Sequence, residues 1–112
     1  MVRLARSADG ARSFARPLTL DDANPVGRVA LATLDDGTLL CAWITQGDKK
    51  AYLVVRGVSI DGRLSETHRV AEISPARTGG FPTMVSLGDS AALAWKRAEG
   101  AAQVLLVKIS VD

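Results

Sequence analysis

Short runs rich in Val, Leu, Ile and Ala alternate with clusters of Gly, Asp and Ser along this chain. No run is long or periodic enough for an amphipathic helix, whereas several have the length and composition of strands. Asp35-Asp36-Gly37 and Ile60-Asp61-Gly62 carry the residues that tight hairpin turns favour, because Asp-Gly readily supplies a positive φ. The pattern predicts four antiparallel strands at residues 28–34, 38–45, 50–58 and 64–73. A longer crossover, SPARTGG, then leads to a further strand that begins near Phe81.

The chain also repeats itself. The tripeptide Ser-x-Asp occurs at 7–9, 59–61 and 110–112, at steps of 52 and then 51 residues. Trp43 and Trp95 are 52 residues apart and close the similar runs LLCAW and AALAW, and Gly27 and Gly79 are also 52 apart. AYLVVRGVSID at 51–61 matches AQVLLVKISVD at 102–112 at a step of 51, which indicates one deleted residue between the second and third strands. Several matches at one spacing indicate a structural repeat.

Four antiparallel strands every ~50 residues, joined by short hairpins and one longer crossover, are typical of a β-propeller blade. A β-sandwich predicts similar strands without this self-similarity. The expected fold is therefore all-β: one incomplete propeller domain over 1–112, with antiparallel four-stranded blades. Its parts are the last two strands of one blade (1–20), a full blade (27–73) and the first three strands of the next (79–112).

Two blades cannot close a ring, since propellers use roughly four to eight. The sequence therefore predicts a fragment of a longer protein or a self-assembling unit. Residues 1–20 could complete the sheet that ends at 112, or pair with a neighbouring chain. The flat faces that normally pack on adjacent blades would be exposed in an open fragment, which leads to association or instability.

Composition and charge exclude some partners. The chain is 112 residues long and 47% hydrophobic, enough for one core, and no apolar run approaches the ~20 residues needed to span a membrane. Its net charge of +2 comes from interspersed basic and acidic residues, so neither nucleic acid nor a membrane is an expected partner. MVRLARSADGARSF lacks the apolar stretch of a secretion signal, which leaves the compartment open.

Cys41 and His68 are the only cysteine and the only histidine. A single cysteine rules out an internal disulfide and a cysteine-based zinc site. No metal or other cofactor is expected. Cys41 lies in the apolar run TLLCAWI, so the favoured interpretation is a buried small hydrophobe. A catalytic Cys-His pair is the alternative.

SADGARSF at 7–14 resembles the Asp box, Ser-x-Asp-x-Gly-x-Thr-Trp, of sialidases and other BNR-repeat propellers. It has Ala11 where glycine is expected. SIDGRLSE at 59–66 is a more degenerate copy with Arg63 and Glu66 at the glycine and aromatic positions, and the third copy ends after Asp112. RTGGFPTMVSLGDSAALAWKR at 77–97 also looks like the first two strands of a sialidase-like blade. The resemblance implies a sialidase-like propeller, a family whose members are often exported.

The resemblance implies a structural role for the box, at the hairpin between the third and fourth strands. A carboxylate two residues after Ser can accept backbone N–H groups of the turn, a later Ser or Thr ties the returning strand, and the aromatic packs into the blade. A metal or ligand role is the less favoured alternative. The residues expected in this structural role are Ser7, Asp9, Ser13, Phe14, Ser59, Asp61, Ser65, Ser110 and Asp112.

Sialidase catalysis in the resembling family needs three arginines on the substrate carboxylate, a tyrosine nucleophile with a glutamate, and an aspartate acid/base. Tyr52 is the only tyrosine. Its position in an apolar run favours packing over catalysis. No full catalytic set can be assigned, so no residue is predicted to be catalytic.

A ligand site would lie where the first strands of propeller blades line the central channel. The candidate ligand-binding residues are Arg28, Arg77, Thr78 and Thr83. Gly79 and Gly80 would allow close approach of a ligand. In the alternative interpretation, Arg77 is a solvated crossover residue and the glycines only shape the turn.

Three functions follow as hypotheses. The first is a non-catalytic structural or glycan-binding scaffold, with carbohydrate and other propeller blades as partners. The second is part of an exo-α-sialidase or related glycoside hydrolase whose catalytic residues lie mostly on other blades. The third is a two-blade lectin that assembles several copies into a ring.

Overall fold

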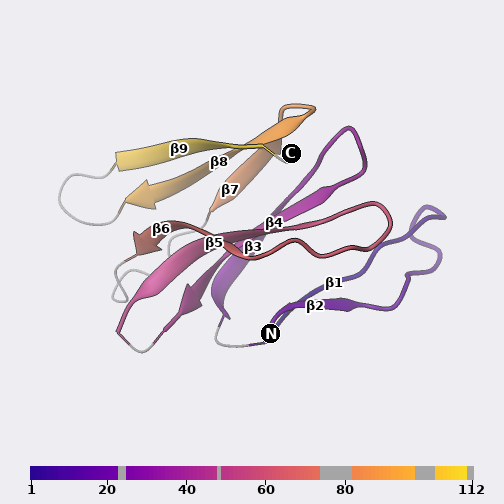
Figure 1. Cartoon of the computed structure of the whole chain (residues 1–112), viewed down its shortest axis with the longest axis horizontal. Coiled ribbons are helices and arrows are strands. Elements are labelled where there is room, and N and C mark those ends of the chain that lie inside the picture. The colour runs from indigo at the N-terminus through magenta and orange to yellow at the C-terminus, as the bar shows by residue number, and fades with distance from the viewer. Residues whose placement is uncertain (23–24, 48, 74–81, 98–102, 111–112) are drawn as a thin grey trace.

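The structure is a computed structural model, and it describes residues 1–22, 25–47, 49–73, 82–97 and 103–110. The described residues form antiparallel sheets and no helix, which confirms the all-β prediction (Figure 1). No helix among them could cross a membrane. The first sheet contains β1 (Val2–Leu4) and β2 (Leu18–Asp21). The middle sheet contains β3 (Pro25–Thr33), β4 (Leu39–Gln46), β5 (Ala51–Val58) and β6 (His68–Ile73), and the third contains β7 (Thr83–Ser86), β8 (Ser90–Arg97) and β9 (Gln103–Ser110).

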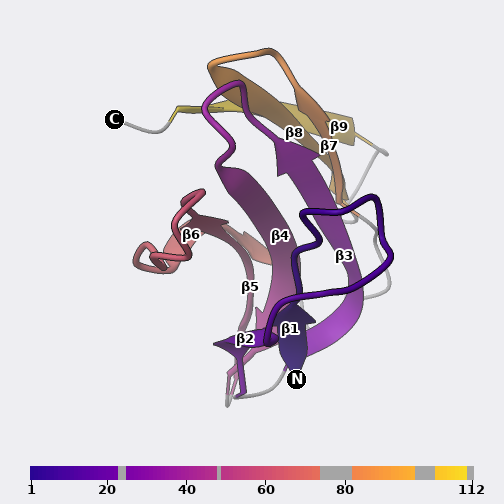
Figure 2. The same cartoon turned by 90° about the vertical axis from the view of Figure 1, so that its right-hand side faces the viewer.

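The three sheets are stacked, with the four-stranded sheet in the middle (Figures 1 and 2). Successive side chains of a strand point to opposite faces. Ala42 and Ile44 therefore face the third sheet, while Cys41 and Trp43 face the first sheet. Because both faces of β4 are covered, its sequence is a continuous apolar run instead of an alternating one.

Two apolar cores hold the layers together. Between the middle and third sheets, residues of β3, β4 and β5 pack with Met84, Ala91 and Leu93. Between the first and middle sheets, Val2 and Leu20 pack on the Cys41–Trp43 face. Among the strands of different sheets, β3 and β7 make the most extensive contact.

The pairing registers test the internal repeat. Trp43 pairs with Val54, and Trp95 pairs with Leu105, so the third strands match at 51 when the second strands match at 52. The predicted one-residue deletion is confirmed.

The step of 52 for the first strands is wrong by one residue. Leu31 pairs with Cys41 and Met84 pairs with Leu93, so the first strands match at 53. The physical reason is hairpin length. The middle sheet closes its first hairpin with Leu34 N–H donating to the Thr38 carbonyl, and the third closes a loop one residue shorter with Leu87 N–H donating to the Ser90 carbonyl.

Two predicted strand bounds also differ. The first strand of the middle sheet begins at Pro25 instead of residue 28. The fourth begins at His68 instead of residue 64, after an isolated bridge between Val58 and Leu64. Side chains of the segment 59–66 bond within the segment and hold it in a turn, so it does not continue the pairing of β5 with β6. The expected start near Phe81 lies outside the described residues, and β7 is described from Thr83.

Candidate functional site

The first Ser-x-Asp segment forms a loop whose polar side chains bond to one another. Ser7 Oγ donates to Asp9 Oδ1 (2.8 Å) and accepts the Ala11 N–H (2.8 Å). Asp9 also accepts the Ser13 N–H (2.9 Å) and the Ser13 hydroxyl (2.5 Å). These bonds, that of the Ser13 hydroxyl first, lower the pKa of Asp9 from 3.8 to about 2. The carboxylate therefore organises the loop.

The second Ser-x-Asp segment has the same bond between its first two polar groups. Ser59 Oγ donates to Asp61 Oδ1 and accepts the Arg63 N–H at 2.9 Å. The Ser59 hydroxyl is the main cause that lowers the pKa of Asp61. Ser65 differs from its counterpart Ser13, because its hydroxyl accepts the Gly57 N–H of β5 (2.8 Å) and ties the returning chain to the strand.

The remaining residues of this expected structural set are described only in part. Ser110 is the last residue of β9, and Asp112 lies outside the described residues. Phe14 was expected to pack into the sheet, and this is wrong, because its side chain is 60% exposed. The first sheet has two strands among the described residues, and its loop 5–17 extends beyond the middle sheet (Figure 1). No described layer therefore covers Phe14.

Ala11 occupies the glycine position of the box in a left-handed conformation, with φ at 72°. Among the described residues it is the one non-glycine with positive φ. Ala11 thus adopts a conformation that favours glycine, at the steric cost that a Cβ has there.

The turns of successive sheets are joined at one end of the stack. Arg6, beside the first box, donates to the Gly37 carbonyl (3.1 Å) and the Ser59 carbonyl (3.3 Å) of the middle sheet. Ile60 lies against Gly37, where a Cβ would come within 2.6 Å of the isoleucine Cδ1. Asp35 N–H in turn donates to the Gly88 carbonyl of the third sheet (2.8 Å). This end of the stack is a chain of turn-to-turn contacts.

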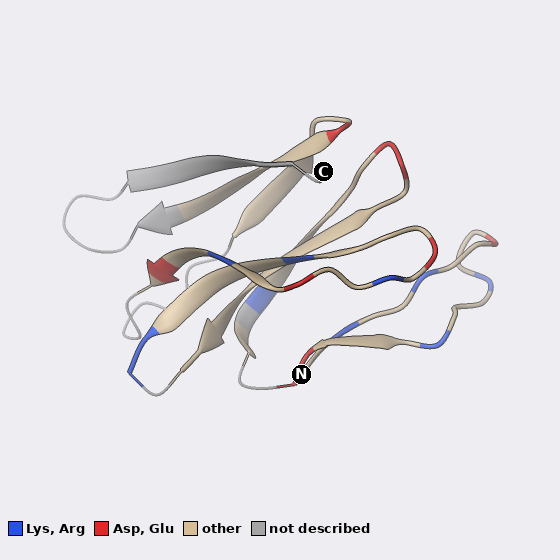
Figure 3. Cartoon of the chain, in the orientation of Figure 1, with Lys and Arg blue, Asp and Glu red and all other residues tan. Residues whose placement is uncertain are grey.

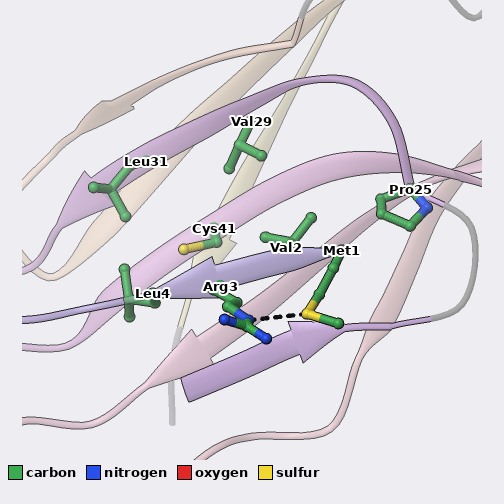
Figure 4. Close-up of a pocket in the computed structure, with 8 residues that line it drawn as sticks. All are labelled: Met1, Val2, Arg3, Leu4, Pro25, Val29, Leu31 and Cys41. Carbon is green, nitrogen blue, oxygen red and sulfur yellow. Dashed lines mark hydrogen bonds between the residues drawn. The ribbon is translucent and has the colours of Figure 1, made fainter. Parts of the chain in front are cut away.

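Two grooves flank the first sheet. One, of about 320 Å³, lies beside the two Ser-x-Asp turns, and its lining includes Arg6, Arg16, Ile60 and Asp61. The other, of about 480 Å³, lies between β1 and the face of β3 (Figure 4). Its lining is apolar apart from Arg3 and includes Val29, Leu31 and Cys41.

The candidate ligand residues are only partly described. Arg28 is exposed on β3, and Thr83 is exposed at the start of β7. The two residues lie on first strands that approach each other closely. Arg77 and Thr78 lie outside the described residues. Figure 3 shows the charged positions dispersed over the sheets and turns, without a block of one sign in the coloured part of the chain.

Cys41 is buried, and burial raises its pKa to about 11, which confirms the prediction of a small hydrophobe. His68 is exposed on β6, and β5 separates it from the strand of Cys41. The structure therefore does not bring a Cys-His pair together. No three potential metal-ligating side chains cluster within the described ranges.

Tyr52 lies on β5, opposite Glu72 on β6. The Arg69 guanidinium covers its ring, 4.0 Å from the centroid, and Glu72 forms an ion pair with Lys50 (3.6 Å). Tyr52 is half-buried and packs against the core beneath the first sheet. These contacts are those of a packing residue, on β5 next to the edge strand β6.

Sequence reasoning missed the polar contacts that hold the first sheet. Trp43 Nε1 donates to Asp21 Oδ2 on β2 at 2.7 Å. Arg56 of β5 donates to the Leu20 carbonyl of β2 at 2.8 Å, and its Nε donates to the Ser65 carbonyl of its own hairpin at 2.8 Å. The one available signal was that a buried indole N–H needs an acceptor, and this does not identify Asp21.

Comparisons with protein-family models, curated proteins and solved structures found no significant match to this chain.

Proposed function

We propose that this chain is a non-catalytic scaffold of the Asp-box β-propeller type, in which each sheet corresponds to all or part of a blade. The observation that carries the proposal is the pair of Ser-x-Asp turns on consecutive stacked sheets. In both turns the Ser hydroxyl donates to the Asp carboxylate and accepts a backbone N–H of the turn, and in the first turn Asp9 also accepts the Ser13 N–H. A carboxylate committed in this way shapes a turn and has little capacity left for chemistry.

The environment of Tyr52 supports a role without catalysis. A nucleophilic phenol needs a neighbouring base and an approach for substrate. Here Arg69 covers the ring, and Glu72 is paired with Lys50. The closest candidate for a sialidase-type nucleophile is thus engaged in packing.

A fluorogenic sialoside assay tests this proposal. We expect no turnover above the buffer blank by the wild type or by Tyr52→Phe. Turnover by the wild type that is lost in Tyr52→Phe would show a contribution to a glycosidase site and reject the non-catalytic role. Lys49→Ala serves as a surface control that leaves Tyr52 and its neighbours intact.

Glycan binding at the first strands is a second candidate function. Arg28 and Thr83 are exposed on β3 and β7, which lie next to each other. Exposed hydroxyl and guanidinium groups are suitable donors to sugar oxygens. Retention of the wild type on an immobilised glycan surface, lost in Arg28→Ala and kept in Arg63→Ala, would support this site. Equal retention of the two variants would exclude it.

A further inference from the structure

Two apolar surfaces are open, one on the middle sheet beside β1 and one on the outer face of the third sheet. On one side, Val29 and Leu31 of β3 are 48% and 51% exposed, next to the groove that borders β1 (Figure 4). On the other side, Val85 of β7 and the adjoining Leu87 are 59% and 57% exposed on the outer face of the third sheet. Isolated exposed apolar residues are common, but two such pairs on or beside the first strands of two sheets call for an explanation.

The internal repeat relates these surfaces to the buried interface inside the chain. With the first strands matched at 53 residues, Leu31 corresponds to Met84, while Ala32 and Leu34 correspond to Val85 and Leu87. Met84, Ala32 and Leu34 are all buried in one cluster between the middle and third sheets. The open surface of β3 is thus equivalent to one side of this interface, and the open surface of β7 is equivalent to the other side.

We propose that a second copy of this chain covers these surfaces, with the outer face of β7 in one copy packed on the open face of β3 in the next. This contact continues the in-chain approach of β3 and β7, and it rests on the repeat architecture of the proposed function. A second copy is the fitting partner because each chain carries both halves of the interface. The groove of about 480 Å³ beside β1 leaves room for an incoming strand.

Such an interface is heterologous, since different surfaces of the two copies meet. It leaves one open surface of each kind at the ends of any linear assembly, so copies add head to tail until a ring closes or a filament grows. This property separates it from a twofold dimer, which uses the same surface on both copies.

Light scattering after size exclusion tests the inference with two variants, Leu31→Lys and Val85→Lys. We expect an oligomeric wild type and a monomer for each variant alone, because each lacks one half of the interface. An equimolar mixture of the two variants keeps one intact pair of surfaces and should give a species of twice the mass of one chain. Phe14→Lys, which changes an exposed apolar residue away from both surfaces, should keep the wild-type mass.

Several results would overturn the inference. These are a monomeric wild type at tens of micromolar, a mixture that stays monomeric, and a dimer that persists in Val85→Lys. If the wild type aggregates, soluble monomers of both variants support the interface and aggregated variants reject it. Circular dichroism verifies that the variants fold, which is expected because both positions are about half exposed. The sialoside assay is independent of this result, so the two proposals can fail separately.

Discussion

At the scale of single residues, the Ser7–Ser13 loop shows how a few polar side chains can fix the shape of a loop that has no hydrophobic core of its own. Most of the first loop is exposed, yet Ser7 Oγ accepts the Ala11 N–H and the Asp9 carboxylate accepts the Ser13 N–H. Such local bonds let a loop keep one shape without burial. The strain at Ala11 and the ionisation of Asp9 are the two features of this loop that can be measured.

Ala11→Gly should stabilise the protein. A Cβ in the left-handed region costs about 1–2 kcal/mol, partly offset by the larger unfolded-state entropy of glycine, so we expect a gain of about 0.5–1 kcal/mol. Urea unfolding measures the gain. Ala8→Gly in the same loop, where φ is negative, should be neutral or destabilising. A lower stability of Ala11→Gly would contradict the left-handed conformation.

The stability of the protein should depend on the charge of Asp9. Because its pKa is depressed in the folded state, its contribution is present above the ordinary value of 3.8 and is lost as the pH falls towards about 2. The free energy of unfolding, measured by denaturant titration between pH 5 and pH 2, should therefore fall less steeply in Asp9→Asn than in the wild type. Ser13→Ala, which removes the main cause of the shift, should also flatten the curve. An unchanged slope in both variants would show that these bonds do not form in solution.

At the scale of strands and sheets, the sequence predicted what is periodic or repeated. The strands and the deletion between the second and third strands followed from apolar runs and from matched segments. The shorter hairpin at Gly88 was missed because loop length changes spacing without changing the composition of the strands. The burial of Phe14 was predicted wrongly, because it would require a neighbouring layer to cover the side chain, and the local sequence does not encode such a layer. The contacts of Arg6 and Trp43 join residues 22 to 53 positions apart, and no local pattern encodes such pairs.

The Trp43–Asp21 bond should be a main polar link between the first and middle sheets. Trp43 is 1% exposed. Trp43→Phe removes the indole N–H, so the partly buried Asp21 carboxylate has one donor fewer. Because the phenyl ring is also smaller than the indole, we expect the free energy of unfolding to fall by about 2–4 kcal/mol. A double-mutant cycle with Asp21→Ala, which removes the acceptor, isolates the pair, and a coupling energy near zero would exclude the bond.

At the scale of the whole molecule, the stacking order predicts a gradient of stability. β4 and β5 are internal strands of the middle sheet, and their side chains are buried on both faces, whereas β1 and β2 form a short pair on one face of it. Local opening free energies follow the number of buried apolar contacts and of protected backbone bonds. Amide hydrogen exchange should therefore be slowest in β4 and β5 and at least 100-fold faster, on the order of 3 kcal/mol less protected, in β1 and β2.

The exchange pattern also separates the layers. Trp43→Phe should accelerate exchange in β1 and β2 more than in β7 and β8, because Trp43 faces the first sheet and not the third. Equal acceleration in both outer sheets would mean that the three layers unfold as one unit. Equal protection of β1 and β4 in the wild type would contradict the order of stacking. Slow exchange in β7 that becomes fast in Val85→Lys would place the outer face of the third sheet at an interface with a second copy.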